Sequence, residues 1–217
     1  MLQVQVETAR FNMIEQQIRP WEVLEQRILD LMSDVPREDF VPMAYRNLAF
    51  VDISIPLAHE QTMMPPKLEG RLLQTLSITP KDTVLEIGTG CGYLTALLAK
   101  LAKHVDSVDI FDDFVKEAAT KLNAFHNISL NTGDAINGWN IDTGYDVIVL
   151  TGSVSMLKPH FQAQLNEGGR LFAIVGDEPV MQAHLISRVA GDFHTEILFE
   201  TSLPPLIGTP APDHFIL

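Results

Sequence analysis

The chain has 217 residues, of which 46% are hydrophobic and 20% charged, a composition typical of one soluble globular domain. Lys and Arg number 15 against 28 Asp and Glu, so the formal net charge of −13 disfavours nucleic acid as a partner, because its phosphates would be repelled. The single cysteine excludes an intramolecular disulfide, and no apolar run approaches the roughly 18 residues that a membrane helix needs. The N-terminal stretch is charged and does not resemble a secretory signal, so a cytoplasmic protein is expected.

The first third of the chain is expected to be helical. Apolar residues recur at helical spacing between Glu22 and Val35, namely Leu24, Ile28, Leu31, Met32 and Val35. Pro36 ends this pattern. Ile53 and Ile55 suit the start of a short strand, and the pair Pro65–Pro66 is expected to open a helix that runs to Leu76.

From Lys81 onward, strands and helices alternate. The predicted strands are Thr83–Ile87, Val105–Ile110, Ile128–Asp134, Tyr145–Gly152 and Gly168–Gly176, with one more expected in the tail from His194. The predicted helices are Leu94–Ala102, Asp112–Phe125 with Asp112 or Asp113 as N-cap, and Pro159–Leu165. This alternation predicts an α/β fold with a Rossmann-like, doubly wound, mostly parallel sheet, preceded by an N-terminal helical extension.

The stretch VLEIGTGCGYLTALLA (84–99) places Gly88, Gly90 and Gly92 between a predicted strand and a helix. In open parallel sheets, ligands bind beyond the carboxyl ends of the strands, and glycine there permits a ligand to approach the backbone closely. A tight turn would explain one such glycine, whereas three together favour a ligand site. The dinucleotide pattern G-x-G-x-x-G is not matched, because Tyr93 occupies the position of its third glycine.

Two carboxylates follow the neighbouring strands. Asp109 ends the second strand, where an acidic side chain can accept hydrogen bonds from ribose hydroxyls or simply be solvated. Asp134 follows the third strand in the turn TGDA, which by itself is weak evidence for a site.

Other chemistries fit poorly. The histidines and Cys91 show no zinc-ligand spacing, and no metal site is predicted. Gly152–Ser155 lacks the second glycine of a nucleophile elbow, and no phosphate-binding P-loop occurs. Cys91 is interpreted as a small filler within the glycine stretch rather than a nucleophile, and Phe40, Tyr45 and Trp139 as core aromatics.

Preceded by Glu86, the segment EIGTGCG resembles the first motif of class I S-adenosylmethionine-dependent methyltransferases. Four further motifs, VPREDFVP, D-x-x-I-P-L from Asp52, Q-T-M from Gln61 and GD-x-x-x-GW from Gly133, are similar to the protein-L-isoaspartate O-methyltransferase family. This resemblance runs from about Met13 to Gly176. It is specific because five motifs of modest individual weight occur together in one chain.

The resemblance implies transfer of a methyl group from S-adenosyl-L-methionine to the α-carboxylate of isoaspartyl residues in damaged proteins. The ester then cyclises to a succinimide, whose hydrolysis partly restores aspartate. A carboxylate with a pKa near ~4 is already ionised at neutral pH, so the reaction requires no strong base. The expected partners are isoaspartyl-containing peptides or proteins, and no feature of the sequence specifies an oligomeric state.

The resemblance also implies the site residues. Those expected at the cofactor are Gln61, Glu86, Ile87, Gly88, Thr89, Gly90, Gly92, Asp109, Ile110, Asp134, Ala135 and Thr151. Thr62 and Met64 are expected at the reacting carboxylate. The whole chain, 1–217, is interpreted as one domain, with a substrate-side segment at 1–80, a cofactor-binding core at 81–176, and C-terminal strands with a proline-rich tail at 177–217.

One loop departs from the family pattern G-x-T-I-S-x-P. This chain reads HEQTMMPP, so Glu60 stands at the usual glycine and Met64 at the serine, while Thr62 is kept. Methionine cannot donate a hydrogen bond. Glu60 would repel an anionic substrate if it faces the pocket; if it points outward, Thr62 alone serves. Two alternatives therefore stay open: a methyltransferase with a different acceptor, and a cofactor-binding protein without catalysis.

Overall fold

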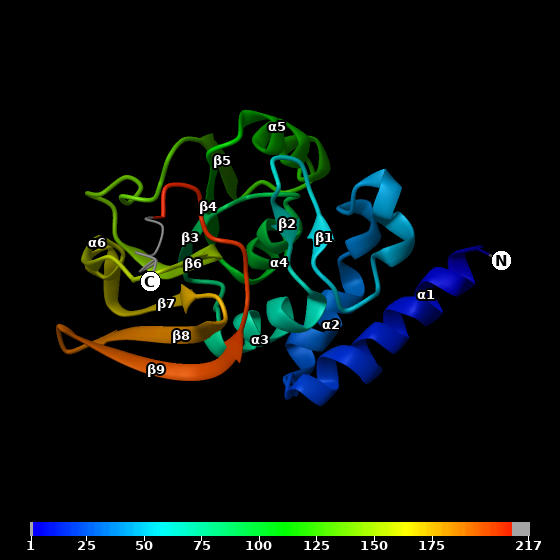
Figure 1. Ribbon diagram of the computed structural model, residues 1–217, viewed down its shortest axis with the longest axis horizontal. Helices are drawn as coiled ribbons and strands as arrows, with labels where there is room; N and C mark the ends of the chain where they lie inside the picture. Colours follow the sequence, from blue (N-terminus) through cyan, green and yellow to red (C-terminus); the bar gives the residue numbers. More distant parts are fainter. Residues whose placement is uncertain (1, 210–217) are drawn as a thin grey trace, which may run out of the picture.

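The computed structural model describes residues 2–209, which are built around one large sheet. Its strands are β3 (Thr83–Ile87), β4 (His104–Asp109), β5 (Ile128–Thr132), β6 (Tyr145–Val154), β7 (Leu165–Asp177), β8 (Val180–Val189) and β9 (Asp192–Thr201). They form a seven-stranded sheet in the order β5-β4-β3-β6-β7-β8-β9 (Figure 1). The pairs from β5 to β7 are parallel, and β8 and β9 are antiparallel.

Three helices connect parallel strands and cover the sheet, whereas the chain from β5 to β6 contains no helix. These helices are α4 (Tyr93–Leu101), α5 (Asp112–Lys121) and α6 (Pro159–Ala163). The chain order runs outward from β3 through β4 to β5 and then returns to place β6 on the other side of β3. The predicted Rossmann-like, doubly wound, mostly parallel sheet is therefore confirmed, and the reversal lies between β3 and β6.

Side chains of β3 alternate between two hydrophobic cores. Val84 packs in the core that contains Leu97 and Leu98 of α4, whereas Leu85 packs in the core that contains Phe161 of α6. All five side chains are fully buried. Complete burial of a residue of this size contributes about 1.5–3 kcal/mol, so both layers hold the sheet in place.

The N-terminal helical extension is also confirmed. Its helices are α1 (Leu2–Met13), a π-helical turn (Ile14–Ile18), the 3₁₀ turns Arg19–Trp21, Arg37–Asp39 and Met43–Leu48, α2 (Gln26–Asp34) and α3 (Pro66–Leu76). A short antiparallel pair, β1 (Ile55–Pro56) and β2 (Thr62–Met63), lies in the chain between the turn Met43–Leu48 and α3. α1 lies at the outer edge of the molecule (Figure 1).

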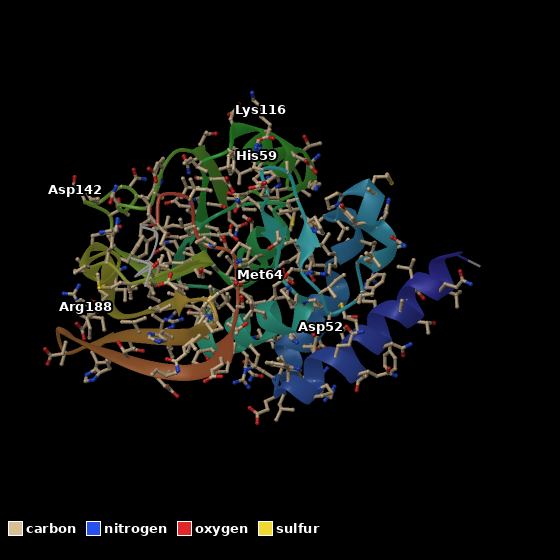
Figure 2. The ribbon with its side chains drawn as sticks, viewed as in Figure 1. Asp52, His59, Met64, Lys116, Asp142 and Arg188 are labelled. Carbon is tan, nitrogen blue, oxygen red and sulfur yellow. The ribbon has the colours of Figure 1, made fainter. Side chains whose placement is uncertain are left out.

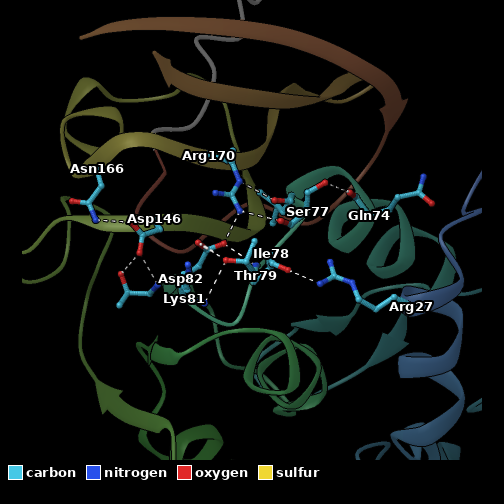
Figure 3. Close-up of polar contacts among 12 residues, drawn as sticks. Arg27, Gln74, Ser77, Ile78, Thr79, Lys81, Asp82, Asp146, Asn166 and Arg170 are labelled. Carbon is cyan, nitrogen blue, oxygen red and sulfur yellow. Dashed lines mark hydrogen bonds and ion pairs between the residues drawn. The ribbon is translucent and has the colours of Figure 1, made fainter. Parts of the chain in front are cut away.

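A polar cluster ties α3 to the end of the sheet where β3 and β6 begin (Figure 3). Arg170 of β7 pairs with Asp82 at 2.7 Å and donates to the Leu76 carbonyl at the end of α3 at 2.8 Å. Asp146 of β6 accepts hydrogen bonds from the Thr83 amide and from Asn166. These bonds close the amino ends of the strands and leave the opposite ends to form a site.

Two local predictions are wrong. Leu24 precedes α2 and is 67% exposed. The amides of Leu24 and Glu25 donate hydrogen bonds to the Gln74 side chain, which hold this stretch outside the helix. Neither Asp112 nor Asp113 is the N-cap of α5. That position is Phe111, whose amide donates to Asp109.

The strand expected in the tail from His194 is confirmed as β9, whereas β8, which precedes that tail, was not predicted. Two long strands, β8 and β9, are joined at Ala190 and Gly191, both with positive φ. Residues 210–217 of the proline-rich tail lie outside the described residues. Within 2–209, no helix combines the length and apolar character needed to cross a membrane.

Candidate active site

A pocket lies at the carboxyl ends of β3, β4 and β6, beside the reversal in strand order. It is lined by most of the residues that were expected at the site: Gln61, Thr62, Met64, Ile87, Gly88, Thr89, Gly90, Asp109, Ile110, Asp134, Ala135 and Thr151. Glu86 and Gly92 do not line it. Ligands of doubly wound sheets bind at this type of position.

The glycines between β3 and α4 have left-handed backbone conformations. Gly88 and Gly90 have φ of 100° and 51°, and both line the pocket. A Cβ on Gly88 would lie 2.0 Å from Thr151 Oγ1, which donates to the Gly88 carbonyl at 2.8 Å. Gly92 serves packing, since a Cβ there would lie 3.1 Å from the Ala118 Cβ of α5.

Asp109 joins the end of β4 to the glycine loop. Its carboxylate accepts hydrogen bonds from the amides of Gly90 at 2.8 Å and Phe111 at 3.0 Å. Burial raises the pKa of Asp109, and these backbone hydrogen bonds oppose the rise. The carboxylate is thus fixed at the pocket edge and keeps lone pairs for a ligand.

Glu86 lies beneath the loop and supports it from below. It is fully buried, and its Oε2 accepts hydrogen bonds from Thr95 at 2.5 Å and Ser107 at 2.6 Å. Ser107 in turn bonds the Thr89 hydroxyl at 2.7 Å. Burial raises the pKa of Glu86 to about 8, and within the described residues its Oε1 has no hydrogen-bond partner.

The far end of the pocket beyond β4 and β5 is more open. Asp134 is exposed, and its Oδ1 accepts a hydrogen bond from the Ile136 amide at 2.9 Å. Ala135 beside it is buried. Ile110 is 39% exposed at the same rim. This end offers an exposed carboxylate beside apolar walls.

The opposite end is formed by β2 and the residue after it, here called the β2 end: Thr62, Met63 and Met64. Both methionines are buried, and Thr62 is half-buried. No hydrogen bond within residues 2–209 occupies the Thr62 hydroxyl. Glu60 is exposed, does not line the pocket, and has a φ of 58°, the left-handed conformation that glycine adopts easily.

Gln61 and its neighbours bring the β1–β2 loop over the pocket. Leu57 and Gln61 line it, and between them the His59 ring stacks on Phe111 with ring centroids 4.0 Å apart. His59 Nε2 lies 2.8 Å from an oxygen of Asp113. Figure 2 shows His59 beside α5 and Met64 in the interior. The loop is thereby attached to the start of α5.

Sequence reasoning missed several lining residues. Glu69 of α3 reaches the β2 end, and Pro204, Leu206 and Ile207 of the C-terminal segment form a further wall. Leu206 is held by its amide, which donates to the Ser153 carbonyl at 2.9 Å. The tail carries no motif, so only the sheet's geometry brings it to the pocket.

Cys91 lines the pocket floor as a buried thiol, and burial raises its pKa to about 11. A thiol with so high a pKa is a poor nucleophile at neutral pH. The described residues hold no group of three or more His, Cys, Asp or Glu side chains arranged to bind a metal ion. Phe40 is buried against Tyr93, with ring centroids 5.5 Å apart, as expected of a core aromatic.

Comparison with known proteins identifies the family of this chain and supports its fold. The model of the family described as Protein-L-isoaspartate(D-aspartate) O-methyltransferase matches residues 8–209. A Plasmodium falciparum structure assigned as a protein-L-isoaspartate O-methyltransferase, in complex with S-adenosyl-L-homocysteine, has a TM-score of 0.78 and 18% identity over 91% of this chain and 97% of its own. Another structure, described as a protein-L-isoaspartate O-methyltransferase, has a TM-score of 0.77 and 23% identity over 92% of this chain, which spans 66% of that protein. These two likenesses establish the fold.

Proposed function

The chain belongs to the protein-L-isoaspartate(D-aspartate) O-methyltransferase family, and from this premise we propose how its pocket performs the family reaction. It transfers a methyl group from S-adenosyl-L-methionine to the α-carboxylate of L-isoaspartyl residues in damaged proteins. The observation that carries the proposal is one continuous pocket with the glycine loop on one side and the Thr62 hydroxyl at the β2 end.

The residues at the glycine loop fit the cofactor. A Cβ on Gly90 would meet only Leu57 within 4 Å, at 3.5 Å, so the protein leaves space on that side of the loop. We assign the main chain of Gly88 and Gly90 to its amino-acid part, Asp109 to its ribose, and Asp134 with Ala135 to its adenine. When bound, the cofactor supplies an electrophilic methyl group on a sulfonium sulfur.

At the β2 end, this chain's residues orient the acceptor. The isoaspartyl carboxylate is ionised at neutral pH and needs no base to remove a proton. Thr62 donates a hydrogen bond to it and turns one oxygen toward the methyl group. Met63, Met64 and Leu206 exclude water, so the reaction depends on alignment of donor and acceptor.

We also propose that the chain, 1–217, is one domain in which three segments each form a different part of the pocket. The segment 1–80 contributes the β2 end and the loop bearing His59, 81–176 contributes the cofactor side, and 177–217 contributes the wall at Leu206. Because Glu60 is exposed and outside the pocket lining, its charge does not oppose an anionic acceptor from within the pocket.

The function is tested by incubating the protein with S-adenosyl-L-methionine and an isoaspartyl peptide. We expect S-adenosyl-L-homocysteine to form together with a base-labile methyl ester, which fragmentation mass spectrometry places on the isoaspartyl α-carboxylate. Cofactor turnover with no ester on this peptide would favour a different acceptor. Cofactor binding with no turnover on any acceptor would favour a non-catalytic protein.

Replacing Asp109 with alanine is expected to weaken cofactor binding about ten- to a hundredfold, because a charge-assisted hydrogen bond contributes roughly 1.5–3 kcal/mol. Calorimetric titration measures this loss. Asp112→Ala is the matched control: this exposed carboxylate lies three residues away outside the pocket lining, and its variant should bind normally. Wild-type affinity in Asp109→Ala would remove Asp109 from the site.

A further inference from the structure

A buried ion pair stands behind the β2 end of the pocket. Glu69, in the first turn of α3, is 1% exposed and lines the pocket beside Met64. Its Oε2 accepts a hydrogen bond from Nη1 of Arg37, which is 0% exposed. A carboxylate buried at the wall of a ligand pocket is not needed for attack by an already ionised acceptor, so it requires a separate explanation.

Arg37 itself is committed to the protein. Its Nε donates to the Ala49 carbonyl at 3.0 Å and its Nη2 to the Met64 carbonyl at 2.6 Å. The guanidinium also lies over the Tyr93 ring, 4.9 Å from its centroid. Arg37 thus links Met64 to Glu69 and does not line the pocket, whereas Glu69 does.

Glu69 is placed to change its protonation state near neutral pH. Burial raises its pKa to about 7, although Arg37 opposes the rise. The other titratable groups that face it are Cys91 and Tyr93, whose pKa values burial raises, and Glu86 on β3, whose pKa is about 8. Both Cys91 and Tyr93 are therefore neutral at pH 7, and Arg37 is the charged partner of Glu69.

At the β2 end, side-chain donors are scarce. Met63 and Met64 have none, and Thr62 has one hydroxyl. Arg37 is the only hydrogen-bond partner of the Glu69 carboxyl group within the described residues, and it engages only Oε2. The other oxygen, Oε1, is left for a ligand in the pocket.

We propose that Glu69 is a second acceptor-binding group beside Thr62, and that its protonated carboxyl group donates a hydrogen bond through Oε1 to the acceptor carboxylate. When Glu69 loses this proton, the donor becomes an acceptor-only carboxylate that repels the anionic substrate. This inference rests on the proposed function and adds to it a positioning group and a direction of pH dependence.

The test is the pH profile of isoaspartyl-peptide methylation by wild type and Glu69→Gln. For wild type we expect kcat/KM to fall about a hundredfold between about pH 6 and about pH 9, as the protonated fraction of a group with a pKa of about 7 falls. Glutamine keeps an oxygen for Arg37 and an N–H donor for the acceptor but does not titrate. Its profile should be flat, several-fold below wild type at about pH 6 and above wild type at about pH 9.

Glu60→Gln is the matched control, because Glu60 is an exposed carboxylate of the β1–β2 loop, outside the pocket lining. Its profile should follow wild type. Calorimetry at about pH 6 should give equal cofactor affinity for all three proteins. In infrared difference spectra, wild type should show carboxylic-acid carbonyl bands that titrate near neutral pH from both Glu69 and Glu86, and only the Glu69 contribution should be missing from Glu69→Gln.

The inference is overturned if wild type methylates the peptide with a flat profile, or if Glu69→Gln retains the wild-type fall. It is also overturned if Glu69→Gln binds the cofactor normally but is inactive at every pH, since the amide keeps a donor. Absence of methylation by wild type at all pH values would instead contradict the proposed function itself.

Discussion

Replacing Gly90 with valine is expected to abolish binding of S-adenosyl-L-methionine in a protein that remains folded. Gly90 has a φ of 51°, and a Cβ there would have only Leu57 nearby, so the added side chain enters pocket space rather than the core. The left-handed conformation costs a non-glycine residue about 1–2 kcal/mol, which a domain of ordinary stability survives. Calorimetric titration, with circular dichroism to verify folding, measures the effect.

Gly88→Val is a poorer test of cofactor binding, although Gly88 and Gly90 belong to the same glycine loop. A Cβ on Gly88 would collide with Thr151 Oγ1 at 2.0 Å, so this variant disturbs the protein as well as the ligand space. Gly90→Ala is the better companion and should weaken binding less than Gly90→Val. A folded Gly90→Val variant with unchanged affinity would reduce the glycine loop to a turn.

Replacing Thr62 with valine is expected to lower turnover of an isoaspartyl peptide about a hundredfold while cofactor affinity stays intact. Valine matches the shape of threonine and has a methyl group in place of the hydroxyl. A hundredfold loss corresponds to about 2.7 kcal/mol, within the range for removal of one positioned donor in a transition state. Thr62→Ser, which keeps the hydroxyl, should stay close to wild type. Equal turnover by Thr62→Val and an active wild type would contradict this role of Thr62.

Met64→Ser is the converse experiment at the same end of the pocket. It adds a donor that the acceptor carboxylate can use, so isoaspartyl turnover should rise. The Met64 carbonyl, which Arg37 binds, is unaffected by the side-chain change. If wild type, Thr62→Val and Met64→Ser all remain at the uncatalysed background, the acceptor is a different compound.

Much of the parallel sheet could be predicted because its strands carry strong local signals. Thr83–Ile87 is a short apolar run before glycines, and the structure begins and ends β3 at the same residues. β8 was missed because its polar and apolar residues alternate with interruptions, and the turn after it uses Ala190 in a left-handed conformation rather than the usual Asn or Asp. Leu24 fits the helical period, yet the hydrogen bonds that the Leu24 and Glu25 amides donate to the Gln74 side chain exclude it from α2.

The candidate site likewise contains residues that the sequence predicted and residues that it did not. The glycine loop, Asp109 and the β2 end were predictable because each follows a strand or belongs to a recognisable motif. Glu69 was not, since an acidic residue in a helix's first turn is usually solvated. One signal was available: Glu69 is spaced three and four residues from Leu72 and Leu73, on the apolar stripe of α3. The wall at Leu206 depends on pairing with Ser153 across 50 or more residues, which no local pattern reveals.

Methylation of an isoaspartyl carboxylate in this pocket is tested most directly by measuring label transfer from methyl-labelled S-adenosyl-L-methionine to an isoaspartyl peptide and to its aspartyl twin of the same sequence. We predict that the isoaspartyl peptide is labelled with a base-labile ester and that its twin stays at background. Equal labelling of the two peptides, or none of either by a protein that binds the cofactor, would contradict the assignment.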